Sequence, residues 1–234
     1  MKFNKSVLAL PLLAAAAGIA HAEVTSTITA TTDYDFRGIS QSAGDPALQA
    51  SLDWSGESGL SAGIWASNVD FGPGTDSDVE IDLYAGYEMS INDDTAWTIG
   101  GVYYLYQGDG DDIDYLELST GLSYKDFSAK LWYSPDFLNS DETAWYIEAK
   151  YSIGLPNDFS LNLHAGYNGG DFWKAVDDEY FDYSIGVSKT VGNFDLGLKW
   201  VDGSDFKPGL DIGDANSSER KVVFTIATTL PWGN

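Results

Sequence analysis

Apolar and polar residues alternate with a period of two along most of the chain. From Val24 to Phe36 the even positions are apolar or small, whereas the odd positions are threonine or aspartate. This alternation is typical of a β-strand with one apolar face. The pattern recurs eleven more times, so the sequence predicts twelve strands. They span residues 24–37, 48–54, 60–66, 79–89, 96–106, 116–124, 127–133, 145–153, 159–167, 181–189, 194–200 and 222–230.

The apolar faces of these strands carry almost no charge. The strand at 96–106 is apolar on both faces, and the pattern does not set its register. In the other eleven strands Lys189 is the only charged residue on an apolar face, although 21% of the chain is charged. Lys189 lies beside a short turn, where its ammonium can extend to a headgroup region. The apolar faces therefore suit contact with lipid.

The connections between the predicted strands alternate in length. Those after even-numbered strands are short, as at 55–59 and 125–126, whereas those after odd-numbered strands are long, as at 107–114 and 202–219. Short turns at one end and long loops at the other are typical of outer-membrane barrels. We therefore predict an all-β fold, a closed antiparallel up-and-down transmembrane β-barrel of about twelve strands.

The bilayer gives this prediction its physical cause. Hydrocarbon offers no hydrogen-bond partner, so a sheet can span it only by closing on itself. Tyrosine and tryptophan near the strand ends suit an interfacial belt. These residues are Tyr34, Trp54, Tyr87, Tyr133, Trp145, Tyr167, Trp200 and Trp232.

The N-terminal segment Met1–Ala22 has the features of a secretory signal peptide. Lys2 and Lys5 precede an apolar stretch, and an Ala-His-Ala sequence ends at Ala22. That stretch is too short to cross a bilayer as a helix. We expect cleavage after Ala22, a barrel over residues 23–234 and a place in the outer membrane of a Gram-negative bacterium. The expected partners are membrane lipid, lipopolysaccharide, the barrel-insertion machinery and small polar solutes.

Composition excludes several classes of function. The net charge of −24 argues against nucleic acid as a partner, and the absence of cysteine excludes a disulfide framework or a thiolate site. His164 is the sole histidine after the signal peptide, and no G-x-S-x-G elbow accompanies it, so we expect no enzyme. The acidic loop at 108–114 lacks the spacing of an EF-hand. We assign no cofactor and no metal site, and a weak divalent site at that loop remains an alternative.

The polar faces of the strands line the interior of the predicted barrel. They carry ten acidic residues, five basic residues and His164. A twelve-strand barrel falls between barrels filled by side chains and open porins, so this lumen should be narrow. The predicted pore-lining residues are Asp33, Asp35, Arg37, Asp53, Glu80, Asp82, Glu88, Glu117, Lys130, Glu148, Lys150, His164, Asp182, Asp195, Lys199 and Lys221.

Four segments resemble a known family. They are TDYDFRGISQ at 32–41, PALQ at 46–49, WASNVDF at 65–71 and EIDLYAGY at 80–87. They are similar to the TorF-type family of proteobacterial outer-membrane porins. The resemblance implies a channel and no established substrate. The chain departs from outer-membrane barrels in general by lacking their terminal aromatic residue, for which Trp232 is a substitute.

The sequence favours a porin-like channel for passive diffusion of small polar, preferentially cationic, solutes through an acidic lumen. Two alternatives stay open. In one, the internal charges pair into a plug and the barrel has a structural or surface-binding role. In the other, the chain is a secreted β-sandwich that binds carbohydrate through its aromatic residues. The long loop at 202–219 is the candidate to fold into the barrel.

Overall fold

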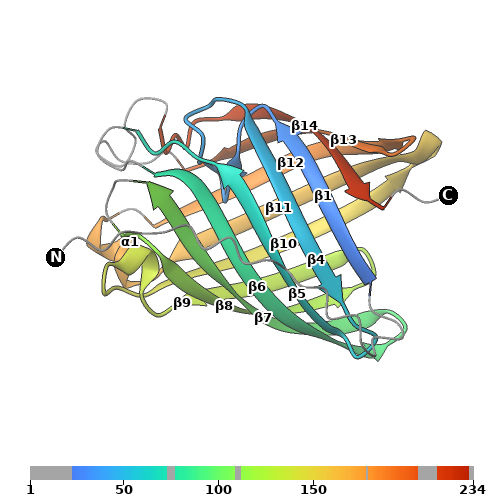
Figure 1. The fold of residues 1–234 in the computed structure, drawn as a ribbon, viewed down its shortest axis with the longest axis horizontal. Helices are drawn as coiled ribbons and strands as arrows, with labels where there is room; N and C mark the ends of the chain where they lie inside the picture. Colours follow the sequence, from blue (N-terminus) through green and yellow to red (C-terminus); the bar gives the residue numbers. More distant parts are fainter. Residues whose placement is uncertain (1–22, 73–76, 109–111, 178, 205–214, 232–234) are drawn as a thin grey trace.

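Twelve strands close into one antiparallel barrel in the computed structural model, which describes residues 23–72, 77–108, 112–177, 179–204 and 215–231 (Figure 1). The barrel strands are β1 (Glu23–Thr31), β4 (Ala47–Ser55), β5 (Leu60–Asn68), β6 (Ser77–Asn92), β7 (Thr95–Gly108), β8 (Tyr115–Tyr124), β9 (Phe127–Ser134), β10 (Ala144–Leu155), β11 (Phe159–Gly169), β12 (Tyr180–Val191), β13 (Phe194–Gly203) and β14 (Lys221–Leu230). Each strand pairs with its neighbours in sequence, and β1 closes the barrel against β14, with Ser26 opposite Leu230.

The two ends of the barrel differ, and we call them the loop end and the turn end. The long connections and the short helix α1 (Asp171–Ala175) lie at the loop end (Figure 1). The 3-10 turn η1 (Phe137–Asn139) belongs to one of these connections. The turn end has short connections, including the 3-10 turn η2 (Pro156–Asp158). None of the helices in the described ranges is long and apolar enough to cross a membrane.

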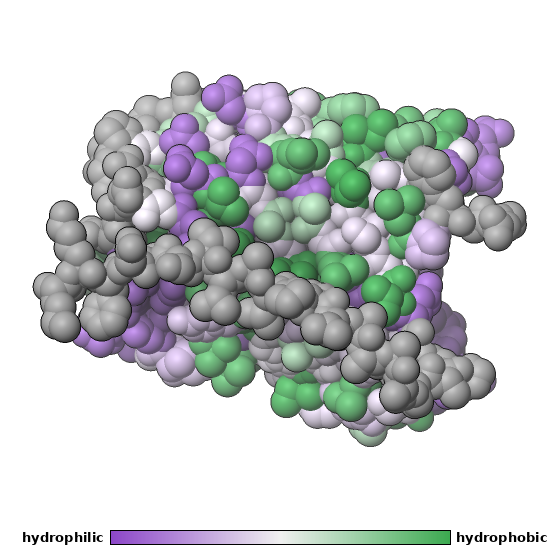
Figure 2. Space-filling view, viewed as in Figure 1, coloured by the Kyte–Doolittle hydropathy of each residue, from purple (hydrophilic) through white to green (hydrophobic). Residues whose placement is uncertain are grey.

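The outer face of the barrel is apolar. Leu83, Ile147 and Ile185 are 46%, 50% and 46% exposed, and most barrel strands contribute further exposed aliphatic or aromatic side chains. Figure 2 shows hydrophobic side chains over the middle of the barrel wall and hydrophilic ones gathered toward the ends. An apolar band on the outside of a closed barrel is the arrangement that a bilayer requires. The predicted fold class is therefore confirmed.

The structure also sets the register of the strand that the alternation left open. In β7, Ile99 and Tyr103 are exposed on the outer face, whereas Tyr104 is 4% exposed and lies inside. The even positions of this strand thus face the lumen. At the turn end, Lys189 lies over the ring of Phe159, with 4.7 Å between its Nζ and the ring centre.

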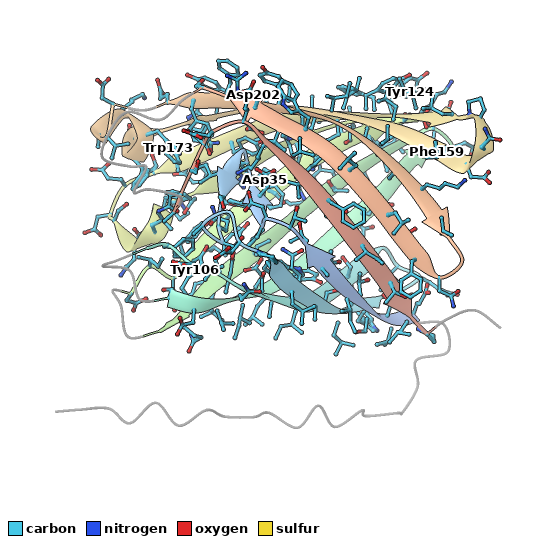
Figure 3. The ribbon with its side chains drawn as sticks, turned by 90° about the horizontal axis from the view of Figure 1, so that it is seen from above. Asp35, Tyr106, Tyr124, Phe159, Trp173 and Asp202 are labelled. Carbon is cyan, nitrogen blue, oxygen red and sulfur yellow. The ribbon has the colours of Figure 1, made fainter. Side chains whose placement is uncertain are left out.

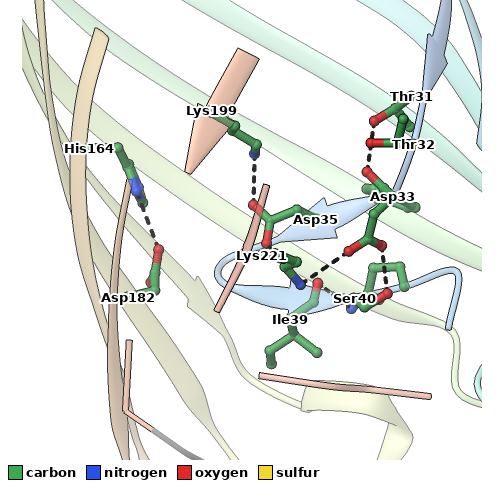
Figure 4. A network of polar contacts seen from close by, with 12 residues as sticks. Thr31, Thr32, Asp33, Asp35, Ile39, Ser40, His164, Asp182, Lys199 and Lys221 are labelled. Atoms are coloured by element: carbon green, nitrogen blue, oxygen red, sulfur yellow. Dashed lines mark hydrogen bonds and ion pairs between the residues drawn. The ribbon is translucent and has the colours of Figure 1, made fainter. Parts of the chain in front are cut away.

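The first predicted strand is wrong beyond Thr31. β1 ends there, and the chain turns into the barrel instead of continuing along the wall. Two short strands, β2 (Asp35–Phe36) and β3 (Ile39–Ser40), form a hairpin in the lumen (Figure 4). We call residues 33–41 the internal hairpin. Tyr34 consequently leaves the predicted aromatic belt: it is 9% exposed and packs edge-on against Trp65, with the ring centres 5.3 Å apart.

Other sequence predictions fall on parts of the chain outside the described residues. The predicted signal peptide at 1–22, the centre of the acidic loop at 109–111 and Trp232 are among them. Most of the loop predicted to fold inward, 205–214, is also outside. The segment that enters the barrel within the described ranges is the internal hairpin.

Candidate functional site

The internal hairpin turns sharply at Arg37 and Gly38. Phe36 pairs with Ile39, which leaves these two residues as the turn, and their φ angles are 53° and 85°. Positive φ at both positions is the geometry of a type I′ turn, which favours glycine at the second. A Cβ atom on Gly38 would lie 2.7 Å from the Cβ of Asp182 on the wall. The tip of the hairpin therefore touches β12.

Arg37 anchors the hairpin to the opposite wall. Its guanidinium donates two hydrogen bonds to the Glu117 carboxylate, at 2.9 and 2.7 Å, and the two side chains are 8% and 0% exposed. The guanidinium carbon also lies 4.4 Å from the ring centre of Tyr146, a cation–π contact. Burial alone would lower the pKa of Arg37, but the charge of Glu117 outweighs burial and raises that pKa well above its usual value.

The two aspartates of the hairpin bind lysines from neighbouring strands (Figure 4). Lys199 Nζ lies 2.7 Å from Asp35 Oδ2, and Lys221 Nζ lies 3.3 Å from Asp35 Oδ1 and 3.5 Å from Asp33 Oδ2. Ser40 donates a hydrogen bond of 2.6 Å to Asp33 Oδ1. The hairpin is thus held by ion pairs on the side of β13 and β14 and by Arg37 on the side of β8.

His164 lies at the centre of a second charged group on the wall. Its Nε2 is 3.3 Å from Glu148 Oε2, and its Nδ1 is 3.3 Å from Asp182 Oδ1. Lys150 Nζ lies 2.8 Å from the same Glu148 oxygen, and Tyr146 donates a hydrogen bond to Asp182 at 3.0 Å. Among the described residues, no serine hydroxyl forms a hydrogen bond with the His164 ring. The arrangement is a charge network on the inner wall of the barrel.

Among the described residues, the remaining predicted pore-lining residues form no ion pair with these two groups. Near the loop end, Glu80 is 2% exposed and accepts a hydrogen bond from Tyr106 at 3.2 Å, and Asp82 lies two positions further along β6. Asp53 accepts hydrogen bonds from Ser51 and Tyr84. Toward the turn end, Glu88 and Lys130 line a common cavity, and exposed Asp195 accepts a hydrogen bond from Thr190.

A row of cavities runs through the barrel. The loop-end pocket, of about 230 Å³, shares Phe36 and Arg37 with a middle cavity of about 330 Å³. The middle cavity shares Lys150, His164 and Lys199 with a turn-end cavity of about 350 Å³. A second turn-end cavity of about 390 Å³ shares Trp132 with the middle cavity. The tip of the internal hairpin therefore stands between the loop-end pocket and the rest of the lumen.

A cluster of aromatic residues at the loop end was not predicted from the sequence. Tyr104, Tyr115, Phe137, Trp173 and Tyr180 are buried there and form one cluster with Ile39 of the hairpin. Figure 3 shows Trp173 and Tyr106 toward this end, and Tyr124 and Phe159 toward the other. One sequence feature pointed to this cluster, namely the apolar inward face of the strand at 96–106. A water-filled lumen does not require apolar side chains on that face.

A closed twelve-strand barrel with an apolar outer face has the fold of a bacterial outer-membrane porin. A KdgM porin superposes with a TM-score of 0.52 at 10% sequence identity, over 88% of this chain and 98% of that chain. A NanC porin gives a TM-score of 0.55 at 8% identity, over 87% and 98%. Such likeness shows a shared fold. No curated protein matches this chain in sequence. The chain belongs to the Gcw_chp family, described as bacterial protein of unknown function, whose model matches residues 15–230.

Proposed function

We propose that this protein is a passive channel for small polar solutes in the outer membrane. A row of cavities from the loop end to the turn end, each sharing lining residues with the next, carries this proposal. A barrel of twelve strands is intermediate between filled and open barrels. A porin of the same fold is known in complex with disordered oligogalacturonate, which supports passage of polar solutes through such a barrel.

The internal hairpin sets the narrowest part of the proposed path. Phe36 and Arg37 line the cavities on both of its sides. Because Arg37 is fixed to Glu117 by two hydrogen bonds, its side chain is a rigid part of the constriction. The proposed path passes the hairpin through the middle cavity, which Phe36 and Arg37 line together with residues of β9–β13.

We further propose a preference for cations. The inward positions carry ten acidic and five basic residues. The six long loops carry twenty acidic residues, and their basic residues are Lys174 and Lys207. Near the hairpin, the acids are paired with Arg37, Lys199 and Lys221, so their local effect is balanced. The excess negative charge lies at the loop end and attracts cations there.

The proposed setting follows from the same fold. We propose that residues 1–22 are a cleaved signal peptide, that the loop end faces outward toward lipopolysaccharide, and that the insertion machinery assembles the barrel. We also propose membership in the TorF-type porin family, on the four segments that carry the resemblance, of which 32–41 includes the internal hairpin. We assign this barrel no catalytic role.

Purified protein in planar bilayers tests the channel proposal. We expect stepwise currents, a reversal potential of cationic sign in a salt gradient, and loss of selectivity as salt screens the loop charges. Folded barrels that never conduct would overturn the proposal. That result would favour a plugged barrel with a structural or surface-binding role, which the buried Arg37–Glu117 pair also supports. An anionic reversal potential would overturn the cation preference alone.

A further inference from the structure

The loop-end pocket is a hollow lined by aromatic rings. Phe36, Tyr106, Tyr115, Phe137, Phe172 and Trp173 are among the residues around its volume of about 230 Å³. The rings of Tyr115 and Phe172 each meet Phe137 edge-on, with centres 4.9 Å apart. Protein interiors leave few voids larger than a water molecule. A space of this size among interlocked rings has the character of a binding site.

One buried polar group points to the chemistry of the ligand. Asn168 lines the pocket and is 1% exposed, and its Nδ2 has no hydrogen-bond partner among the residues that the structure describes. A buried donor without a partner is unfavourable, and an acceptor on a ligand would satisfy it. Gln41 and Asn216 also contribute amide side chains to the lining of this pocket.

The charge of the pocket indicates a neutral ligand. Among the described residues, Arg37 is the only charged one that lines it, and both ends of its guanidinium are bound to Glu117. No described residue of the lining is aspartate or glutamate, although the chain contains 36 of them. A free anion or cation would thus lack a countercharge in this pocket.

We propose that the loop-end pocket binds a neutral monocyclic aromatic molecule whose hydrogen-bond acceptor takes the amide proton of Asn168. The volume is below the roughly 300 Å³ of sites for drug-sized ligands, so it suits one ring. Ring faces and edges on the wall complement an aromatic ring. A sugar would leave most of its hydroxyl groups without partners against these apolar walls. Binding at this pocket does not depend on the proposed channel, whereas capture of such solutes for transport rests on the proposed function.

Benzamide is the probe, because it combines one aromatic ring with a neutral carbonyl acceptor. Binding is measured by ligand-observed NMR with the barrel in lipid nanodiscs, so that partition into lipid is equal for all variants. We expect saturable binding of benzamide, and weaker binding of cyclohexanecarboxamide, which keeps the acceptor and lacks the aromatic ring. Equal binding of the two amides, or saturable binding of glucose in place of benzamide, would overturn the proposal.

Three variants locate the site. Asn168→Leu removes the donor and should weaken benzamide binding about tenfold. Ile113→Trp fills the pocket from a loop and should abolish saturable binding. Asn162→Leu makes the same change as Asn168→Leu on β11, but at a turn-end cavity, and should leave binding unchanged. Circular dichroism and heat-dependent gel migration verify folding of each variant.

Saturable binding that persists in folded Ile113→Trp protein would refute the pocket. Failure of this inference is distinguishable from failure of the channel. Conductance without benzamide binding would refute the binding pocket and leave the channel proposal intact. Benzamide binding without conductance would refute the channel proposal and leave the binding pocket intact.

Discussion

The charges of Arg37 and Glu117 tolerate burial because they are paired with each other. Arg37 and Glu117 are both removed from water and share two short hydrogen bonds. Desolvating two charges is costly, and losing one partner strands the other in a low-dielectric site. The contribution of such a pair is therefore revealed most clearly by single and double substitutions.

Arg37→Ala should lower the free energy of unfolding by about 3–5 kcal/mol, because it leaves Glu117 buried without a countercharge. The double variant Arg37→Ala/Glu117→Gln should recover part of this loss. Urea unfolding from liposomes, followed by tryptophan fluorescence, measures both. Lys125→Ala is the matched control: Lys125 and its partner Asp94 are 55% and 53% exposed, and loss of an exposed pair costs about 0–1 kcal/mol. An equal effect of the two single substitutions would show that the Arg37–Glu117 pair does not hold the hairpin.

The sequence predicts which residues face inward and does not predict which of them pair. Strand parity alone assigns Glu117, Glu148, His164 and Asp182 to the lumen side, because successive side chains of a strand point to opposite faces. Pairing depends on where the internal hairpin lies across the barrel. Arg37 ends the first predicted strand, 24–37, whereas in the structure it lies at the tip of the internal hairpin and reaches Glu117 on β8.

At the scale of elements, the strands were predictable and the internal hairpin was not. Apart from β7, which is apolar on both faces, the barrel strands keep a two-residue period, since each meets lipid on one side along its length. Tyr34 and Phe36 continue that period although the chain has left the wall, because their rings pack inside against Trp65 and Tyr104. Arg37-Gly38 between two short alternating segments is the turn signal that identifies the hairpin.

Replacing the internal hairpin, residues 33–41, by an equally long Gly/Ser segment should raise single-channel conductance several-fold. The replacement removes the side chains that stand between the loop-end pocket and the middle cavity, while the barrel wall keeps its strand pairing. The same replacement at 139–142, in another connection at the loop end, is the control and should leave conductance close to the wild-type value. An unchanged conductance after replacement of the hairpin would show that the constriction lies elsewhere.

At the scale of the whole molecule, the side of the barrel wall on which a side chain lies decides how much a charge there lowers the free energy of unfolding. An outward residue in the middle of a strand faces hydrocarbon, and its inward neighbour faces a polar cavity. Ile185 and Ser184 are such a pair at the centre of β12: Ile185 is 46% exposed on the outer face, and Ser184 lines the middle cavity.

Ile185→Arg should therefore lower the free energy of unfolding by about 2–4 kcal/mol, because it places a cation at the bilayer midplane. Ser184→Lys adds the same charge one residue away, in a cavity that also holds Glu148 and Asp182, and should change that free energy by less than about 1 kcal/mol. Urea titration of both variants in liposomes measures the difference. A larger loss for Ser184→Lys than for Ile185→Arg would mean that β12 presents its other face to lipid. The assignment of inward and outward faces in this barrel would then be wrong.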